Sequence, residues 1–307
     1  MAAARRLPEH VEPMLARLGA PFDDDDWLFE LKWDGVRAIA YVEGAGLRLH
    51  GRRRRDLADR YPELQGLTQL PDGTIVDGEL VVLRDDGSPD FRAMIGRENT
   101  TAARAAAAAR AQPVHYVVFD VLYLGFASLL DRPLVERRRA LERLLAADPP
   151  PRVLLSEGVV GRGRDMFAAA CERGLEGIVG KRLSAPYRPG ERGAAWQKFK
   201  PQQVVHCLVL GYEPDGERDF KSLIVASDFD GRLQCVGKVG SGLDAATKAT
   251  LRAWLFARRA DRPLVPSRER GVWVEPGLFC RVGFLERTDS GALRAPVFLG
   301  IVDDGKP

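Results

Sequence analysis

Short strand patterns separated by glycine turns dominate the first two thirds of this 307-residue chain. The clearest run predicts three strands, at residues 27–31, 36–42 and 47–50, with Asp34-Gly35 between the first two. Glycine allows the backbone angles that tight turns between strands require.

Helical patterns interrupt these strands. Residues 75–83 and 115–124 extend the β pattern, whereas residues 134–147 and 165–173 carry apolar side chains at helical spacing. The Ala/Arg-rich stretch 101–111 is compatible with a helix or with a mobile excursion. The mixture predicts an α+β fold.

The pattern changes after Lys200-Pro201, where short strands surround a single helix. The strands are expected at residues 204–212, 222–228, 233–239, 272–285 and 297–301. Several short strands and one helix within roughly a hundred residues are typical of a small barrel of the oligonucleotide-binding (OB) type. We therefore expect two domains, residues 1–201 and 202–307.

Composition excludes several classes of protein. The chain has 45% apolar residues and a net charge of only +3, which is ordinary for a folded protein and too small to indicate nucleic acid by itself. Its four cysteines are widely spaced, which predicts neither a disulfide framework nor a zinc site. No apolar run approaches the roughly 20 residues of a membrane span, so we expect a cytosolic protein without a membrane partner.

Lysine is rare in this chain, and its positions are informative. Eight of the 46 basic residues are lysines. Where charge alone is needed the sequence has arginine, so a lysine can mark a position that requires a deprotonatable amine. Lys32 lies in the segment ELKWDGVR at the end of a predicted strand, where a partly buried neutral amine would be a nucleophile. The alternative is a solvated lysine on a surface hairpin.

Two glutamates lie in otherwise apolar strand patterns. Glu79 is in VDGELV and Glu176 is in LEGIVGKR. A buried carboxylate is costly unless it pairs with a cation or binds a metal. The two strands could therefore present carboxylates to magnesium bound to phosphate. Structural ion pairs with arginine are the alternative.

The segment WQKFK places Lys198 and Lys200 on one face of a predicted strand. Two aligned cations suit a polyphosphate, although a solvated strand face would have the same pattern. The sequence contains no P-loop, dinucleotide fingerprint, H-E-x-x-H or G-x-S-x-G motif.

The ordered motifs K-x-D-G-x-R, D-G-E, F-D, E-G-I-V-x-K-R and W-x-K-x-K resemble those of covalent nucleotidyltransferases. Within that superfamily the chain resembles ATP-dependent DNA ligases, especially the ligase module of bacterial ligase D and its stand-alone relatives. The resemblance extends from about residue 21 to residue 307. It implies an ATP-grasp-like adenylation domain of antiparallel sheets with helices, followed by an OB-fold barrel.

The resemblance also implies roles for individual residues. Lys32 matches the lysine that attacks the α-phosphate of ATP and carries AMP, which then passes to a DNA 5′-phosphate. Glu79 and Glu176 match carboxylates that bind magnesium, or manganese in its place. The positions that match nucleotide contacts are Glu30, Arg37, Arg52, Phe119, Lys181, Lys198 and Lys200, with Phe119 stacking on adenine.

Two segments depart from the family pattern. Gly51 and Arg53 replace the serine and asparagine that usually flank the arginine matched by Arg52. The terminal motif has Val302 in place of an arginine and one extra residue before Lys306. Because that motif orients ATP in the family, we expect slow self-adenylation unless another residue, such as Arg294, takes its place.

The expected substrate is nicked or broken double-stranded DNA, and the expected enzyme is a monomer. The resemblance extends to end joining, which implies end-binding and polymerase proteins as partners. An RNA ligase or a capping guanylyltransferase would share the lysine chemistry, and a non-catalytic nucleic-acid-binding protein could share the scaffold.

Overall fold

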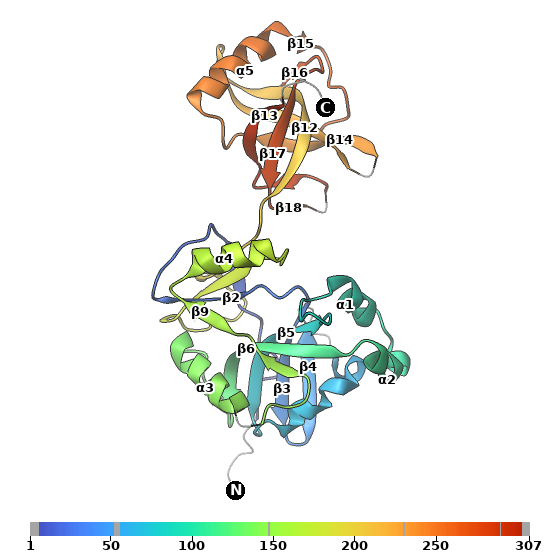
Figure 1. Ribbon diagram of the computed structural model, residues 1–307, viewed down its shortest axis with the longest axis vertical. Coiled ribbons are helices and arrows are strands. Elements are labelled where there is room, and N and C mark those ends of the chain that lie inside the picture. The colour runs from blue at the N-terminus through green and yellow to red at the C-terminus, as the bar shows by residue number, and fades with distance from the viewer. Residues whose placement is uncertain (1–5, 52–55, 147, 230, 289, 303–307) are drawn as a thin grey trace. The chain divides into compact units, whose positions relative to one another are not determined.

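The chain forms two compact units, Met1–Lys200 and Pro201–Pro307 (Figure 1). The computed structural model describes residues 6–51, 56–146, 148–229, 231–288 and 290–302. Each unit has hydrophobic clusters of its own. No helix in these described ranges is both long and apolar enough to span a bilayer.

The first unit contains a six-stranded sheet that is antiparallel except at one edge. Its order is β4 (Gly46–Gly51), β3 (Val36–Glu43), β5 (Thr74–Val82), β6 (Val114–Leu124) and β7 (Ala127–Ser128), with β8 (Val153–Leu155) parallel to β6. The central strands β5 and β6 are buried along most of their length, and most of their residues are apolar.

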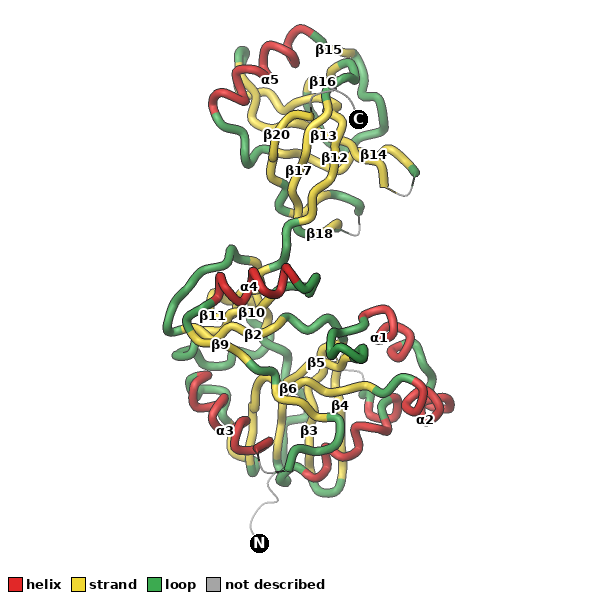
Figure 2. The backbone as a smooth tube through the Cα atoms, in the orientation of Figure 1, coloured by secondary structure: helices red, strands yellow, loops and turns green. Residues whose placement is uncertain are grey.

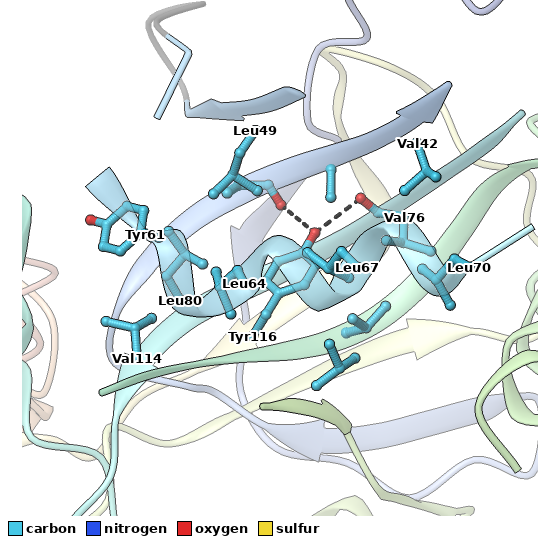
Figure 3. Packing of buried hydrophobic residues seen from close by; sticks show 14 of the residues in the cluster. Val42, Leu49, Tyr61, Leu64, Leu67, Leu70, Val76, Leu80, Val114 and Tyr116 are labelled. Carbon is cyan, nitrogen blue, oxygen red and sulfur yellow. Dashed lines mark hydrogen bonds between the residues drawn. The ribbon is translucent and has the colours of Figure 1, made fainter. Parts of the chain in front are cut away.

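Short helical segments cover this sheet and complete its core. They are η1 (Ala58–Arg60), η2 (Pro62–Gln69), α1 (Phe91–Glu98) and α2 (Ala102–Ala111). Figure 3 shows Leu64 and Leu67 of η2 packed among side chains of the strands. In the same cluster, the Tyr116 hydroxyl lies 2.8 Å and 3.0 Å from the carbonyl oxygens of Ala38 and Val76, which satisfies a buried polar group.

The second sheet of this unit has five strands. Its order is β1 (Leu15–Leu18), β11 (Arg192–Phe199), β10 (Ile178–Arg182), β2 (Trp27–Leu31) and β9 (Gly158–Val160), and only the β1–β11 pair is parallel. Helix α4 (Gly163–Glu172) packs on it through Ala170. Helix α3 (Leu134–Ala146) is joined to β6 by a buried pair, in which Arg137 donates to Asp120 at 2.8 Å and 2.9 Å.

The chain passes from one sheet to the other between β2 and β3. Residues 32–35 make this crossing, so Lys32 lies where the two sheets meet. Gly35 is needed here because a Cβ at this position would lie 2.1 Å from the Leu80 carbonyl oxygen. The close approach of β3 to β5 thus fixes the turn that follows Lys32.

The second unit has the strand order of an OB fold. Its strands are β12 (Gln203–Asp215), β13 (Asp219–Phe229), β14 (Arg232–Val239), β15 (Arg259–Ala260), β16 (Val272–Val274), β17 (Phe279–Phe284), β18 (Glu286–Arg287), β19 (Leu293–Arg294) and β20 (Val297–Val302). The path β14-β13-β12-β17-β20 is closed by a bridge between Ser241 and Val297. Helix α5 (Ala245–Ala257) follows β14, and Asp244 caps it by accepting from the Thr247 N–H at 2.7 Å.

The predicted α+β fold with an OB-type barrel is confirmed, and two local interpretations are refined. The stretch at 101–111 is mostly helix, α2 (Figure 2). The prediction that Glu176 lies within a strand is wrong, because β10 begins only at Ile178. Gly177, with φ of +125°, separates Glu176 from the strand.

Candidate active site

Lys32, Glu176 and Lys200 form an ion-pair cluster at the junction of the two sheets. Lys32 Nζ lies 2.5 Å from Glu176 Oε2, and Lys200 Nζ lies 3.0 Å from Glu176 Oε1. The Lys32 N–H also donates to the Gly177 carbonyl oxygen at 3.0 Å. The loop before β10 therefore holds both the backbone and the amine of Lys32.

Asp34 completes this cluster as a second carboxylate. Burial raises the pKa of Asp34, and the charge of Glu176 raises it further, while Lys32 and Lys200 oppose the shift. The sequence shows Asp34 only as part of a turn. Its position in K-x-D-G, two residues after the lysine, is the signal that could have assigned it to the site.

Glu30 and Lys181 form a buried pair beside this cluster. Both side chains are 2% exposed, and Lys181 Nζ contacts Glu30 Oε2. Burial raises the pKa of Glu30 and lowers the pKa of Lys181, and each shift is opposed by the charge of the partner. The two residues come from adjacent strands, Lys181 from β10 and Glu30 from β2, which are hydrogen-bonded to each other.

Aromatic rings and cations gather around Phe119 of β6. Lys181 Nζ lies 4.2 Å from the centre of the Phe119 ring and 4.6 Å from that of Trp196. The Arg37 guanidinium lies 5.0 Å from the Phe119 ring centre. Within the described ranges, the buried indole N–H of Trp196 has no hydrogen-bond partner. The group can offer a flat aromatic surface, positive charge and an unused donor.

Arg37 is itself held by a buried carboxylate. Its Nε and Nη2 donate to the two oxygens of Asp77 at 2.9 Å and 2.6 Å, and the Tyr187 hydroxyl donates to Asp77 at 2.6 Å. Burial opposes the charge of Arg37, but Asp77 outweighs this effect and keeps the pKa of Arg37 above its ordinary value. Asp77 gave no signal in the sequence beyond being the aspartate of D-G-E.

The other predicted site residues are placed as follows. Glu79 of β5 is the direct partner of Arg37 across the β3–β5 pair. Lys198 lies in β11 opposite Val179 of β10. Arg52 lies outside the described residues. Among the described His, Cys, Asp and Glu side chains, no group of three could hold a metal ion.

A pocket of about 360 Å³ opens beside Lys32. Trp33, Arg173 and Leu175 contribute to its walls. The candidate nucleophile is therefore accessible from one side, while its amine is held by Glu176.

In the second unit, Arg294 is already engaged. Its Nη1 donates to Glu286 Oε1 at 2.6 Å across the β18–β19 pair. Val302 ends β20, opposite Phe279 of β17. Lys306 lies beyond the part of the chain that the structure describes.

Comparisons with known proteins agree with this geometry. A family model for the ATP dependent DNA ligase domain matches residues 8–200, and one for the ATP dependent DNA ligase C terminal region matches residues 216–305. The chain is 35% identical to the multifunctional non-homologous end joining protein LigD of Pseudomonas aeruginosa. That match covers 97% of this chain but 36% of the relative, so the chain spans about a third of LigD.

Two further proteins match this chain along nearly their whole length. The SPbeta prophage-derived DNA ligase-like protein LigB of Bacillus subtilis is 30% identical, over 94% of this chain and 97% of the relative. The crystal structure of the ligase domain from M. tuberculosis LigD covers 97% of both chains, with a TM-score of 0.59 and 31% identity. The chain therefore belongs to the ATP-dependent DNA ligases, with a ligase module of the LigD type.

Proposed function

We propose that this chain seals breaks in DNA through a lysyl-AMP intermediate on Lys32. The observation that carries the proposal is the position of Lys32 at the junction of the two sheets, where its amine contacts one oxygen of Glu176 while Lys200 contacts the other. Around it lie further cations and an aromatic ring, which suit a nucleoside triphosphate.

The proposed reaction has three steps. The neutral amine of Lys32 attacks the α-phosphorus of ATP, a P–N bond forms, and pyrophosphate leaves. A DNA 5′-phosphate oxygen then attacks the same phosphorus, which breaks the P–N bond and gives 5′-adenylated DNA. Finally a neighbouring 3′-hydroxyl attacks the DNA phosphorus, closes the backbone and releases AMP.

The donor set fits ATP. Phe119 supplies an aromatic face for the base, and Arg37 and Lys181 lie within about 5 Å of its ring centre. The unused N–H of Trp196 is a hydrogen-bond donor that a ligand could satisfy. The charge that develops during attack at phosphorus requires fixed cations, which Lys200 and Lys198 would provide. Glu30 and Arg52 complete the proposed nucleotide contacts.

The carboxylates would hold a divalent cation together with phosphate oxygens, because no three of the described side chains could hold one alone. Asp34 and Glu176 lie close enough for the charge of Glu176 to raise the pKa of Asp34, and Glu79 adds a carboxylate on β5. Magnesium, or manganese in its place, prefers such oxygen ligands and completes its shell with phosphate oxygens and water. When bound, the cation would neutralise phosphate charge and compete with Lys32 for the Glu176 carboxylate.

We further propose that the substrate is nicked or broken double-stranded DNA in end joining. The support is the name of the Pseudomonas relative, which places that protein in non-homologous end joining. End-binding and polymerase proteins are then the expected partners. Matched nicked duplexes of DNA and RNA, tested side by side, separate this proposal from an RNA ligase.

The decisive experiment follows the label of α-labelled ATP. Wild-type protein is expected to retain label after denaturation and to lose it when nicked DNA is added. Lys32→Ala should take no label, yet seal a nick that already carries 5′-AMP, because sealing does not consume the amine. Lys221→Ala, which changes an exposed lysine on β13, is the matched control and should label normally.

Two results would overturn the assignment. Label on the Lys32→Ala protein would show that another residue is the nucleophile, and mapping would identify it. An unlabelled wild-type protein, with ATP, GTP and either divalent cation present, would show that the chain is a nucleic-acid-binding relative without ligase chemistry.

A further inference from the structure

An arginine of α3 reaches into the proposed active site. Arg138 Nη1 donates to Glu30 Oε1 at 2.9 Å and to the Ser156 carbonyl oxygen at 2.6 Å. Its Nε donates to Glu142 Oε1 at 2.8 Å. The side chain is 10% exposed, so these contacts are formed largely out of water. The guanidinium is thus fixed by three acceptors.

Glu30 depends on this arginine. One carboxylate oxygen of Glu30 meets Arg138 and the other meets Lys181. Burial raises the pKa of Glu30, and both cations counter that shift. A buried carboxylate that loses one of its two partners is strongly destabilised as an anion. Arg138 therefore helps to determine both the charge and the direction of the Glu30 side chain.

The second contact of Arg138 leads to the other side of Lys32. The Ser156 hydroxyl accepts a hydrogen bond from the Trp33 indole N–H at 3.2 Å, and the Ser156 carbonyl oxygen accepts one from Arg138. Ser156 is fully buried and its own N–H donates to Val118 of β6 at 2.8 Å. Arg138 is thereby connected to Glu30, which precedes Lys32 by two residues, and to Trp33, which follows it.

We propose that Arg138 is a positioning residue for formation of the lysyl-AMP intermediate. It holds the Glu30 carboxylate directly and, through Ser156, the turn that carries Lys32. The proposal rests on the proposed function, because it assigns Arg138 a task in the chemistry of Lys32. Arg137, its neighbour on α3, differs in that it binds Asp120 and backbone carbonyl oxygens and so joins α3 to β6.

The test measures single-turnover self-adenylation over a range of ATP concentrations. Small displacements of a reacting group are costly, so Arg138→Met should slow adenylation at saturating ATP by about a hundredfold. Arg138→Lys keeps a cation that can donate to Glu30, and it should recover part of that loss. Sealing of a pre-adenylated nick should be affected less than adenylation, because Lys32 does not react in that step.

A matched control separates positioning from general stability. Arg97 is another buried arginine of the same unit, 1% exposed, and its Nη1 donates to Glu63 at 2.7 Å. Arg97→Met should lower the melting temperature but leave the adenylation rate of the folded protein unchanged. Melting is followed by circular dichroism, and rates are measured well below the melting temperature of each variant.

Ser156→Ala tests the same connection if Arg138→Met does not fold. It removes the acceptor of the Trp33 N–H and leaves Glu30 with both partners, so adenylation should slow by about two- to tenfold. Wild-type rates in Ser156→Ala or Arg138→Met, or an Arg138→Lys variant no faster than Arg138→Met, would overturn the inference. A wild-type protein that takes no label would instead overturn the proposed function.

Discussion

At the scale of single residues, Glu176 connects two cations with different proposed tasks. Its oxygens contact Lys32, the proposed nucleophile, and Lys200, a proposed phosphate ligand. An ion pair favours the charged form of an amine, whereas attack on phosphorus requires the neutral form. In the proposed reaction, a metal ion bound with ATP would compete with Lys32 for the Glu176 carboxylate and so release the amine.

Removal of the Glu176 or the Glu79 carboxylate tests the proposed metal site. We expect Glu176→Ala and Glu79→Ala each to lower the rates of adenylation and sealing by about a hundredfold or more. Without the carboxylate, the metal ion that it would hold no longer stabilises the charge at phosphorus. Their folds should survive, because a partly buried charge is removed. Rates across a magnesium titration are compared with Glu172→Ala, an exposed carboxylate at the end of α4. A wild-type rate in either variant would make that residue structural.

Asp34 gives a second residue-scale prediction, in stability against pH. Its pKa is raised by burial and by Glu176 above the ordinary value of 3.8. A carboxyl with a raised pKa in the folded state favours folding below pH 3.8 and loses that contribution as pH rises through the folded value. At neutral pH we therefore expect Asp34→Asn to increase the free energy of unfolding, by less than about 1 kcal/mol because solvent screens the group.

Urea unfolding at several pH values measures this effect. The gain in Asp34→Asn should shrink as the pH falls toward 3.8 and vanish below it, where the wild-type carboxyl is protonated in both the folded and the unfolded state. A gain that does not change with pH would show that charge is not its cause.

At the scale of secondary structure elements, the sequence predicted much of the fold but little of the contact between elements. Alternation and glycine turns located β2, β3, β5 and β6, because local pattern determines which face of a strand is buried. The contact between Arg138 and Glu30 joins positions 108 residues apart. Local pattern holds no information on such a pair, so the role of α3 in the site emerged only from the structure.

The wrong prediction of a strand at Glu176 has a local cause that can be tested. Gly177 has φ of +125°, and a Cβ there would lie 2.0 Å from the Phe199 carbonyl oxygen. Gly177→Ala should therefore lower the free energy of unfolding by about 1–3 kcal/mol and slow adenylation, since the Gly177 carbonyl accepts from the Lys32 N–H.

Gly174→Ala is the matched control for this change. Gly174 also has a positive φ, +65°, but nothing lies within 4 Å of its Cβ position. It should lose about 1 kcal/mol of stability and keep its adenylation rate. Equal effects of both variants on adenylation would show that the contact with Phe199 is irrelevant to the site.

At the scale of the whole molecule, two units with separate cores were predictable from the change of pattern at Lys200-Pro201. The sequence predicted a barrel of the OB type but not the contact that closes it. That contact, the bridge between Ser241 and Val297, lies outside any regular strand pairing. The proposed nucleotide contacts that the structure describes all belong to the first unit. Ligand binding should therefore stabilise one unit and leave the other unchanged.

Calorimetry of the full chain tests this division. We expect two unfolding transitions. Leu64→Ala identifies the transition of the first unit and Leu251→Ala that of the second, because each leucine is buried in the core of its unit. Each variant should lower the free energy of unfolding by about 2–5 kcal/mol. ATP at a hundred times its Kd, added to the non-reacting Lys32→Ala protein, should stabilise only the transition that Leu64→Ala lowers, by about 2.7 kcal/mol. A single transition that both core variants lower would mean that the units unfold together, and the gain from ATP would then extend to the barrel as well.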